Sequence, residues 1–130
     1  GTCSIAQRAG IVAYEQGLET VEKMKEAFLR RRELVYNLLN NIPGVKTNLP
    51  DGAFYFFPEI SSFFGKKDAD GSVIKNSSDL ALYLLNVGHV ATVGGDSFGN
   101  DNYIRLSYAA ADDKLVEALK RIKEALAKLS

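Results

Sequence analysis

The run Ala53–Phe57 constrains the fold more than any other part of this sequence. Its residues are apolar and mostly aromatic, the turn signal Leu49–Gly52 precedes it, and Pro58 closes it, a pattern that predicts a strand. Successive side chains of a strand point to opposite faces, so both faces of this strand are apolar. Such strands are covered on both sides. We therefore expect helices on one face and, on the other, a body outside a small two-layer domain.

Two helical patterns precede this strand. Ser4–Gln16 is predicted to form a short helix that ends or bends near Gly17. Leu18–Ile42 is predicted to form a long helix, which the dipeptide Pro43–Gly44 ends. The basic run Arg30–Arg32 has acidic residues within helical reach, so we expect it to be a solvated face. The apolar stripe of the long helix is predicted to contain Val21, Met24, Phe28, Val35, Leu38 and Ile42.

Helix and strand signals continue after a polar loop. A helix is predicted over Asp79–Asn86, with Ser77 or Ser78 as its cap and Gly88 in the position of a C-terminal glycine. A strand is then predicted at Val90–Val93.

The end of the chain has the pattern of an amphipathic helix capped by Asp112, with outer ion pairs from Glu117 to Arg121 and from Glu124 to Lys128. The order of elements predicts an α+β two-layer sandwich. We expect a small, mostly antiparallel sheet of three or four strands with helices on one face, preceded by a long helix. The inward residues of the last helix are predicted to be Leu115, Leu119, Ile122, Leu126 and Leu129.

Composition excludes several classes of function. The 130 residues include 16 basic and 16 acidic side chains, whereas binding to nucleic acid or to an anionic membrane requires a basic excess. A single cysteine, Cys3, cannot form an internal disulfide, and no secretory signal pattern is present. We therefore expect a cytoplasmic protein with neither nucleic acid nor membrane as a partner. Because the chain begins with Gly1, it is expected to be a processed protein or a fragment.

Arg105 is the strongest candidate for a binding residue. It lies in the predicted strand Tyr103–Tyr108, whose alternation places it with Tyr103 and Ser107 on the face opposite the core. A planar guanidinium held there is suited to binding a carboxylate or phosphate through two parallel hydrogen bonds. On chemistry alone, an ordinary ion pair on the sheet face is the simpler explanation. The preceding loop, Gly94–Gly99, lacks the known phosphate-binding patterns and is interpreted as a backbone turn.

Four segments of the chain are each a weak signal alone. Their order and spacing, taken together, are a specific signal for one protein family. The segments are Arg31–Leu34 leading to Pro43–Val45, then Asp51–Tyr55, Val90–Gly99 and Tyr103–Ala109. In this order they resemble the interdomain helix, the x-G-A-F-Y strand, the V-A-x-V-x-G-x-x-F-G loop and the x-I-R-L-S-Y-A strand of one family. The chain thus resembles the C-terminal (small) domain of a fold-type I pyridoxal-phosphate-dependent aminotransferase of the aspartate aminotransferase family.

The resemblance implies an organisation and an activity. Residues 1–17 would be the remnant of the large-domain terminal helix, and residues 18–130 the aminotransferase small domain. The intact enzyme would be a homodimer that transfers an amino group between an amino acid, aspartate-like, and a 2-oxo acid. Its cofactor would be pyridoxal phosphate. The partners implied are these two substrates and the large cofactor-binding domain of the same chain.

The resemblance also implies site residues. Arg105 is similar to the arginine that binds the substrate α-carboxylate, and Phe54 to an aromatic residue that borders the substrate. Gly52 is expected to let the backbone approach closely. Gly95 and Phe98 belong to the loop that helps to close the pocket.

The family's reactive groups are not found in this chain. None of the ten lysines lies in the family's Schiff-base motif, so the chain alone is predicted to be inactive and to bind neither cofactor nor metal. Gly94 stands where the family often has proline. Two other hypotheses stay open: a stand-alone regulatory module that binds a small carboxylate, and a structural domain that interacts through its aromatic strand.

Overall fold

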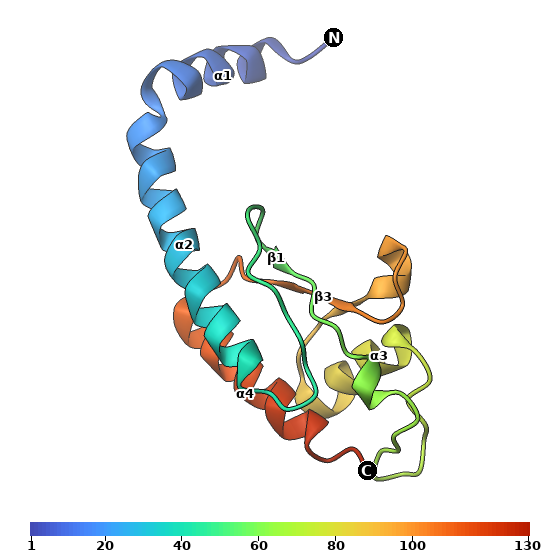
Figure 1. Cartoon of the computed structure of the whole chain (residues 1–130). Coiled ribbons are helices and arrows are strands. Elements are labelled where there is room, and N and C mark those ends of the chain that lie inside the picture. The colour runs from blue at the N-terminus through green and yellow to red at the C-terminus, as the bar shows by residue number, and fades with distance from the viewer.

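The computed structural model describes residues 1–130 and contains four α-helices, a three-stranded sheet and two short 3₁₀ helices (Figure 1). The first two helices follow one another with a break at Gly17, as predicted. The helices are α1 (Ser4–Gln16), α2 (Leu18–Asn40), α3 (Ser77–Gly88) and α4 (Asp112–Leu126), the strands are β1 (Tyr55–Phe56), β2 (Val93–Gly94) and β3 (Ile104–Ser107), and the 3₁₀ helices are η1 (Ser61–Phe63) and η2 (Gly95–Phe98).

The sheet is antiparallel with the order β1-β3-β2, which confirms the predicted α+β class. Its edge strands are shorter than predicted. β1 excludes Ala53, whose φ of +59° is incompatible with a strand. β2 excludes Val90, because its N–H donates to Leu84 O at the end of α3 and is not available to the sheet. Only the central strand β3 reaches close to its predicted length.

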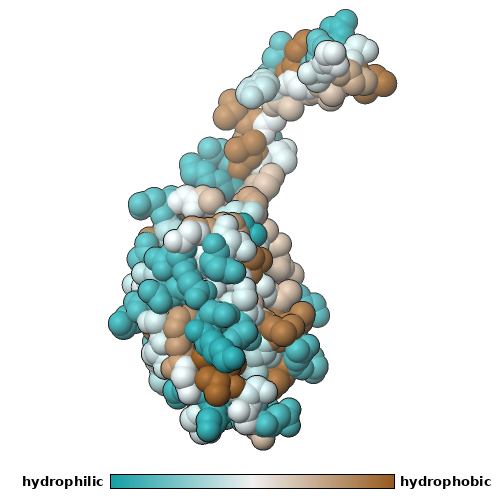
Figure 2. Space-filling model, turned by 90° about the vertical axis from the view of Figure 1, so that its right-hand side faces the viewer, coloured by the Kyte–Doolittle hydropathy of each residue, from teal (hydrophilic) through white to brown (hydrophobic).

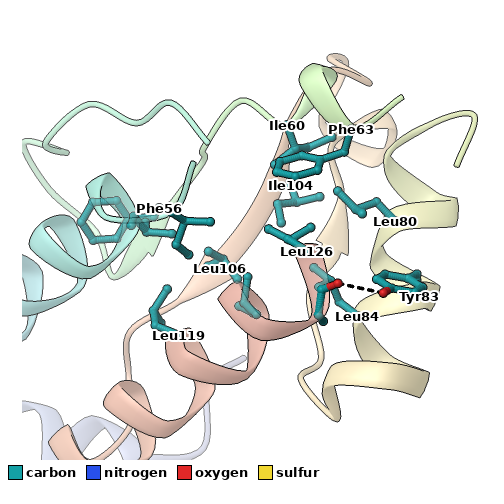
Figure 3. Close-up of a cluster of buried hydrophobic side chains, with 14 of the residues drawn as sticks. Phe56, Ile60, Phe63, Leu80, Tyr83, Leu84, Ile104, Leu106, Leu119 and Leu126 are labelled. Carbon is teal, nitrogen blue, oxygen red and sulfur yellow. Dashed lines mark hydrogen bonds between the residues drawn. The ribbon is translucent and has the colours of Figure 1, made fainter. Parts of the chain in front are cut away.

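The core lies between the sheet and the helices (Figure 3). Phe56, Ile104 and Leu106 of the strands are buried in this core, and all five predicted inward residues of the last helix are buried. Each such side chain contributes about 1.5–3 kcal/mol of burial free energy. Tyr83 of α3 donates its hydroxyl to Ala125 O at 2.8 Å, which satisfies a polar group within the apolar interface.

α1 and the first part of α2 extend away from this core (Figures 1 and 2). α1 has no buried residue, and α2 buries only Val35 and Leu39. The predicted stripe of α2 is therefore wrong at Val21 and Met24, which are exposed, whereas Phe28 is half-buried and packs against Tyr108 of the core. No helix here is both long and apolar enough to pass through a membrane. The exposed apolar residues of this arm are Ile5, Ile11, Val12, Tyr14, Leu18, Val21 and Met24.

Both ends of α3 differ from the prediction. The N-cap is Asn76, whose side chain accepts a hydrogen bond from Asp79 N at 2.8 Å, and not Ser77 or Ser78. At the C-terminus the left-handed residue is His89, with φ +54°, while the preceding glycine is still helical.

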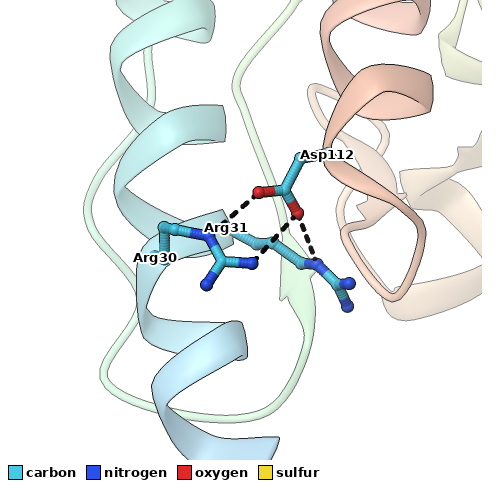
Figure 4. A network of polar contacts seen from close by, with 3 residues as sticks. All are labelled: Arg30, Arg31 and Asp112. Atoms are coloured by element: carbon cyan, nitrogen blue, oxygen red, sulfur yellow. Dashed lines mark hydrogen bonds and ion pairs between the residues drawn. The ribbon is translucent and has the colours of Figure 1, made fainter.

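Asp112 also differs from its predicted role. It is the first residue of α4 and caps no backbone group, since Ala111 is the N-cap. Its carboxylate instead accepts hydrogen bonds from Arg30 and Arg31, each with Nε at 2.9 Å (Figure 4). These two arginines are therefore not a purely solvated face, because their partner comes from another helix. On α4 the predicted pair Glu117–Arg121 is present at 2.8 Å, whereas the pair expected at Glu124 is not formed.

Candidate functional site

β3 places Arg105 at the centre of the sheet. Its chain neighbours Ile104 and Leu106 are buried in the core, so alternation leaves Arg105 half-buried on the opposite face. β1 and β2 hydrogen-bond to β3 from its two sides, and Val93 pairs directly with Arg105. The backbone that carries the guanidinium is therefore fixed on both edges.

Two aromatic rings contact the guanidinium of Arg105. Its Cζ lies 4.5 Å from the ring centroid of Tyr55 and 4.4 Å from that of Phe98. An aromatic ring can attract a guanidinium that lies against the ring, whereas the N–H groups of the guanidinium donate hydrogen bonds within the plane of the guanidinium. Contact with both rings is thus compatible with bidentate binding of a carboxylate.

No carboxylate of the chain occupies that position. All seven ion pairs of the structure involve other basic residues, and Arg105 donates no side-chain hydrogen bond within the chain. The simpler explanation for Arg105, an ordinary ion pair on the sheet face, is therefore not what the structure shows.

Tyr55 was not among the residues predicted from the sequence. It joins the site because it pairs with Ser107, which lies on the same face of β3 as Arg105. The aromatic group continues from Phe98 to Phe57, with ring centroids 6.1 Å apart, and from Phe57 to Tyr103, stacked at 4.9 Å. The alternation of aromatic residues along the chain was visible, but the strand register that aligns them with Arg105 was not.

Gly95 is required by the backbone of the adjacent loop. Its N–H donates to Tyr103 O at 2.8 Å, and a Cβ there would overlap the carbonyl oxygens of Asn100 and Tyr103. Only glycine permits this close approach. The residue acts through the shape of the loop that carries Phe98.

Phe54 and Gly52 lie beside this group rather than within it. The Phe54 ring is 40% exposed and lies 4.4 Å from the Tyr55 ring. A Cβ on Gly52 would meet nothing within 4 Å, so the close approach expected there does not occur within this chain. The unusual backbone belongs to Ala53, whose carbonyl accepts a hydrogen bond from Tyr108 Oη at 2.7 Å.

The lysines of this chain lie in surroundings unlike those that a Schiff-base lysine needs. Nine of the ten are exposed, and the half-buried Lys66 directs its ammonium to Leu129 O at 3.4 Å. A reactive lysine requires desolvation or a neighbouring cation that lowers its pKa. The residues present therefore do not fit pyridoxal phosphate as a covalently held group. The structure also contains no cluster of three or more His, Cys, Asp or Glu side chains placed to hold a metal ion.

The fold and the order of its segments define a class of protein. The family model for aminotransferase class I and II matches residues 2–122, and the chain belongs to this family. It is 42% identical over 129 residues to an aspartate aminotransferase of Pinus pinaster, covering 97% of this chain and 26% of that protein. It therefore corresponds to one part, the C-terminal region, of these longer relatives.

Solved structures agree with this assignment. The aspartate aminotransferase from Rhizobium meliloti superposes with a TM-score of 0.92 at 42% identity, covering 98% of this chain and 32% of that chain. The alanine aminotransferase from Pyrococcus furiosus superposes with a TM-score of 0.81 at 29% identity, covering 94% of this chain and 29% of that one. The chain thus spans about 30% of the length of the proteins that it resembles.

Proposed function

We propose that this chain supplies the substrate-carboxylate clamp of an aminotransferase, with Arg105 as the clamp. The observation that carries the proposal is the guanidinium of Arg105, held against Tyr55 and Phe98 without an acidic partner in the chain. A guanidinium in this state has its in-plane donors available for an incoming acid.

The range of relatives supports a carboxylate as the ligand. This fold occurs in proteins described as an aspartate aminotransferase and as an alanine aminotransferase. Their named substrates differ in the side chain and share the α-carboxylate. A region common to both is therefore suited to recognising the shared group, and the side chain of the substrate would be read by residues elsewhere.

The aromatic neighbours would strengthen such binding. Tyr55 and Phe98 lie close to the guanidinium and reduce its contact with water, and an ion pair gains strength as its surroundings become less polar. Because β3 is held on both sides, the arginine would bind the carboxylate without a large loss of backbone freedom. Phe54, Gly52 and Gly95 are proposed to line or shape the same pocket.

The remaining parts of the site would lie outside this chain. Pyridoxal phosphate serves as an electron sink in aminotransferases, and we propose that a large domain of the same protein holds it. Residues 1–17, with their exposed apolar side chains, would belong to that domain, and residues 18–130 would form the small domain. The whole protein would be a cytoplasmic homodimer that transfers an amino group from an aspartate-like amino acid to a 2-oxo acid. The isolated chain would be inactive.

Steady-state kinetics of the full-length protein test the proposal. Arg105→Ala removes two charge-assisted hydrogen bonds, worth about 1.5–3 kcal/mol each, and kcat/KM for amino and 2-oxo acids should fall at least about 100-fold. Arg121→Ala is the matched control, because Arg121 is paired with Glu117 on the outside of α4. Unchanged kinetics in Arg105→Ala would remove this residue from the site.

Calorimetry on the 130-residue chain separates the enzyme from a stand-alone carboxylate sensor. If the pocket needs a second domain, aspartate and 2-oxoglutarate should show no saturable binding to the isolated chain at millimolar concentration. Tight binding that is lost in Arg105→Ala would favour the sensor instead.

A further inference from the structure

Ser77 is the one polar residue of the chain that is completely buried, with 0% of its surface exposed. It lies in the first turn of α3 and contacts the segment that connects β2 to β3. Its hydroxyl donates to Asp101 Oδ1 at 2.6 Å, and its backbone N–H donates to the same oxygen at 2.9 Å. These bonds lower the pKa of Asp101 from its ordinary value. The start of α3 is thereby tied to the segment that leads into β3.

Asp96 provides a second tie to the same turn of α3. Ser78 donates its hydroxyl to Asp96 Oδ2 at 3.1 Å, and the backbone N–H of Asp96 donates to Ser77 Oγ at 3.3 Å. Ser77 has one hydroxyl proton, which we assign to Asp101 because Asp96 Oδ1 is farther away, at 3.5 Å. The N-terminus of a helix favours negative charge, so α3 attracts both carboxylates.

Phe98 lies two residues after Asp96 in η2. A 3₁₀ helix has three residues per turn, so these two side chains leave η2 in different directions. Asp96 reaches α3, while Phe98 contacts Arg105 with its ring centroid 4.4 Å from Cζ. Phe98 is 45% exposed, so packing alone holds its ring weakly. The orientation of η2 against α3 therefore decides where this ring lies.

Gly94 makes room for the Asp96 carboxylate. Its φ of −58° and ψ of 142° suit any residue, so backbone freedom does not explain the glycine. A Cβ at this position would lie 2.6 Å from Asp96 Oδ1 and 2.8 Å from Ser78 Oγ. The missing side chain at Gly94 is what lets Asp96 reach the start of α3.

We propose that Ser77 and Ser78 are positioning residues. Ser77, through Asp101 and the backbone N–H of Asp96, and Ser78, through the Asp96 carboxylate, hold η2 so that Phe98 packs against Arg105. The consequence for catalysis rests on the proposed function, whereas the geometry concerns this chain alone. α3, which contributes no side chain to the aromatic group, would thus determine how the arginine is covered.

NMR spectroscopy of the 130-residue chain tests the geometry. Ser77→Ala, Asp96→Ala and Gly94→Ala should each remove the Phe98–Arg105 nuclear Overhauser contacts and move the Arg105 side-chain proton signals toward their random-coil positions. Ser97→Ala is the matched control, because it removes an exposed hydroxyl from the same short helix and should change neither signal. Gly94→Ala displaces the same carboxylate that Asp96→Ala removes, so the double variant should be no worse than either single variant.

Unchanged Arg105 signals in Asp96→Ala and Gly94→Ala would overturn the proposal. Asp96 is exposed, and a Cβ on Gly94 would meet only the ends of polar side chains, so these variants keep the test decisive even if the buried Ser77→Ala fails to fold. In the full-length protein, Asp96→Ala should raise KM for amino acids roughly 3- to 10-fold and change kcat less than about twofold. Altered NMR signals with an unchanged KM would support the positioning and contradict the carboxylate clamp.

Discussion

The arginines of α2 and the arginine of β3 have opposite surroundings. Arg30 and Arg31 share the carboxylate of Asp112, so both are paired with an acidic group within the chain (Figure 4). Arg105 contacts the rings of Tyr55 and Phe98 and has no acidic partner in the chain. The first pair joins two helices, whereas the second arrangement leaves a cation able to accept a ligand.

The difference shows why charge alone does not identify a binding site. The three consecutive arginines of α2 are the most basic run in the sequence, yet at least two of them serve to connect α2 with α4. A guanidinium that is paired internally would have to break those bonds before it could bind a substrate. A guanidinium held by aromatic rings loses none of its in-plane hydrogen bonds.

The largest expected effect concerns the shape of the Arg105 side chain. Arg105→Lys keeps the positive charge and loses the planar fork, so kcat/KM of the full-length protein should fall about 100-fold or more. The melting temperature should change little, because Arg105 stabilises no ion pair in the chain. A lysine variant with nearly full activity would show that charge alone is sufficient, and the contrast between the two arginine groups would lose its meaning.

A smaller effect is expected when one of the covering rings is removed. Phe98→Leu deletes a cation–π contact worth about 0.5–2 kcal/mol, so KM for amino acids should rise roughly 2- to 30-fold. Tyr55→Phe, which keeps the ring, is expected to behave nearly as the wild type. If Phe98→Leu and Tyr55→Phe gave the same KM, the rings would not be what prepares the arginine.

The paired arginines should affect stability rather than activity. Arg30 and then Arg31, through hydrogen bonds, lower the pKa of Asp112 to about 2 from 3.8. Because the folded-state pKa is lower than the unfolded one, this stabilisation is complete above about pH 4 and is lost as the pH falls toward 2. Asp112→Asn should lower the melting temperature by a few degrees at pH 7. Between pH 4 and 2, the free energy of unfolding of this variant should fall less than that of the wild type.

Urea unfolding at pH 7, 4 and 3 measures this dependence. Kinetic constants of the full-length Asp112→Asn protein should match those of the wild type. A large loss of activity with no loss of stability would place this arginine pair in the site and remove the distinction from Arg105.

The smallest effect is expected on the outer face of α4. Arg121→Ala breaks an exposed ion pair between residues four apart, which is worth about 0.3–0.5 kcal/mol. Thermal unfolding should detect little change, and added salt should remove what change there is. If Arg121→Ala lowered the melting temperature more than Asp112→Asn does, this surface pair would contribute more to stability than the Arg30–Arg31–Asp112 group.

Local patterns predicted the helices well. The bounds of α1 and the inward face of α4 follow from periodicity and from the glycine at position 17, which are properties of neighbouring residues. Short strands were less predictable: β1 and β2 have only two residues each, because their limits depend on where β3 pairs with them. The partners of Asp112 were also missed, since α2 and α4 are about 80 residues apart in sequence.

Some features of the candidate site could likewise be predicted from the sequence, and others could not. Alternation along β3 indicated that Arg105 faces away from the core, and the sequence resemblance predicts that it binds a carboxylate. Tyr55 was missed, although it is one of the two rings against the guanidinium. No spacing in the sequence places Tyr55 opposite Ser107, because strand register is set by pairing between distant segments.

The sequence by itself determined which segments form helices, which face of β3 enters the core and to which family the chain is similar. Each of these depends on interactions within a few residues or on the identities of the residues themselves. Only the tertiary structure decided that Arg30 and Arg31 pair with an acidic residue while Arg105 does not. Whether an arginine has an acidic partner depends on which distant groups come within hydrogen-bonding distance, and that is fixed when the helices and strands pack together.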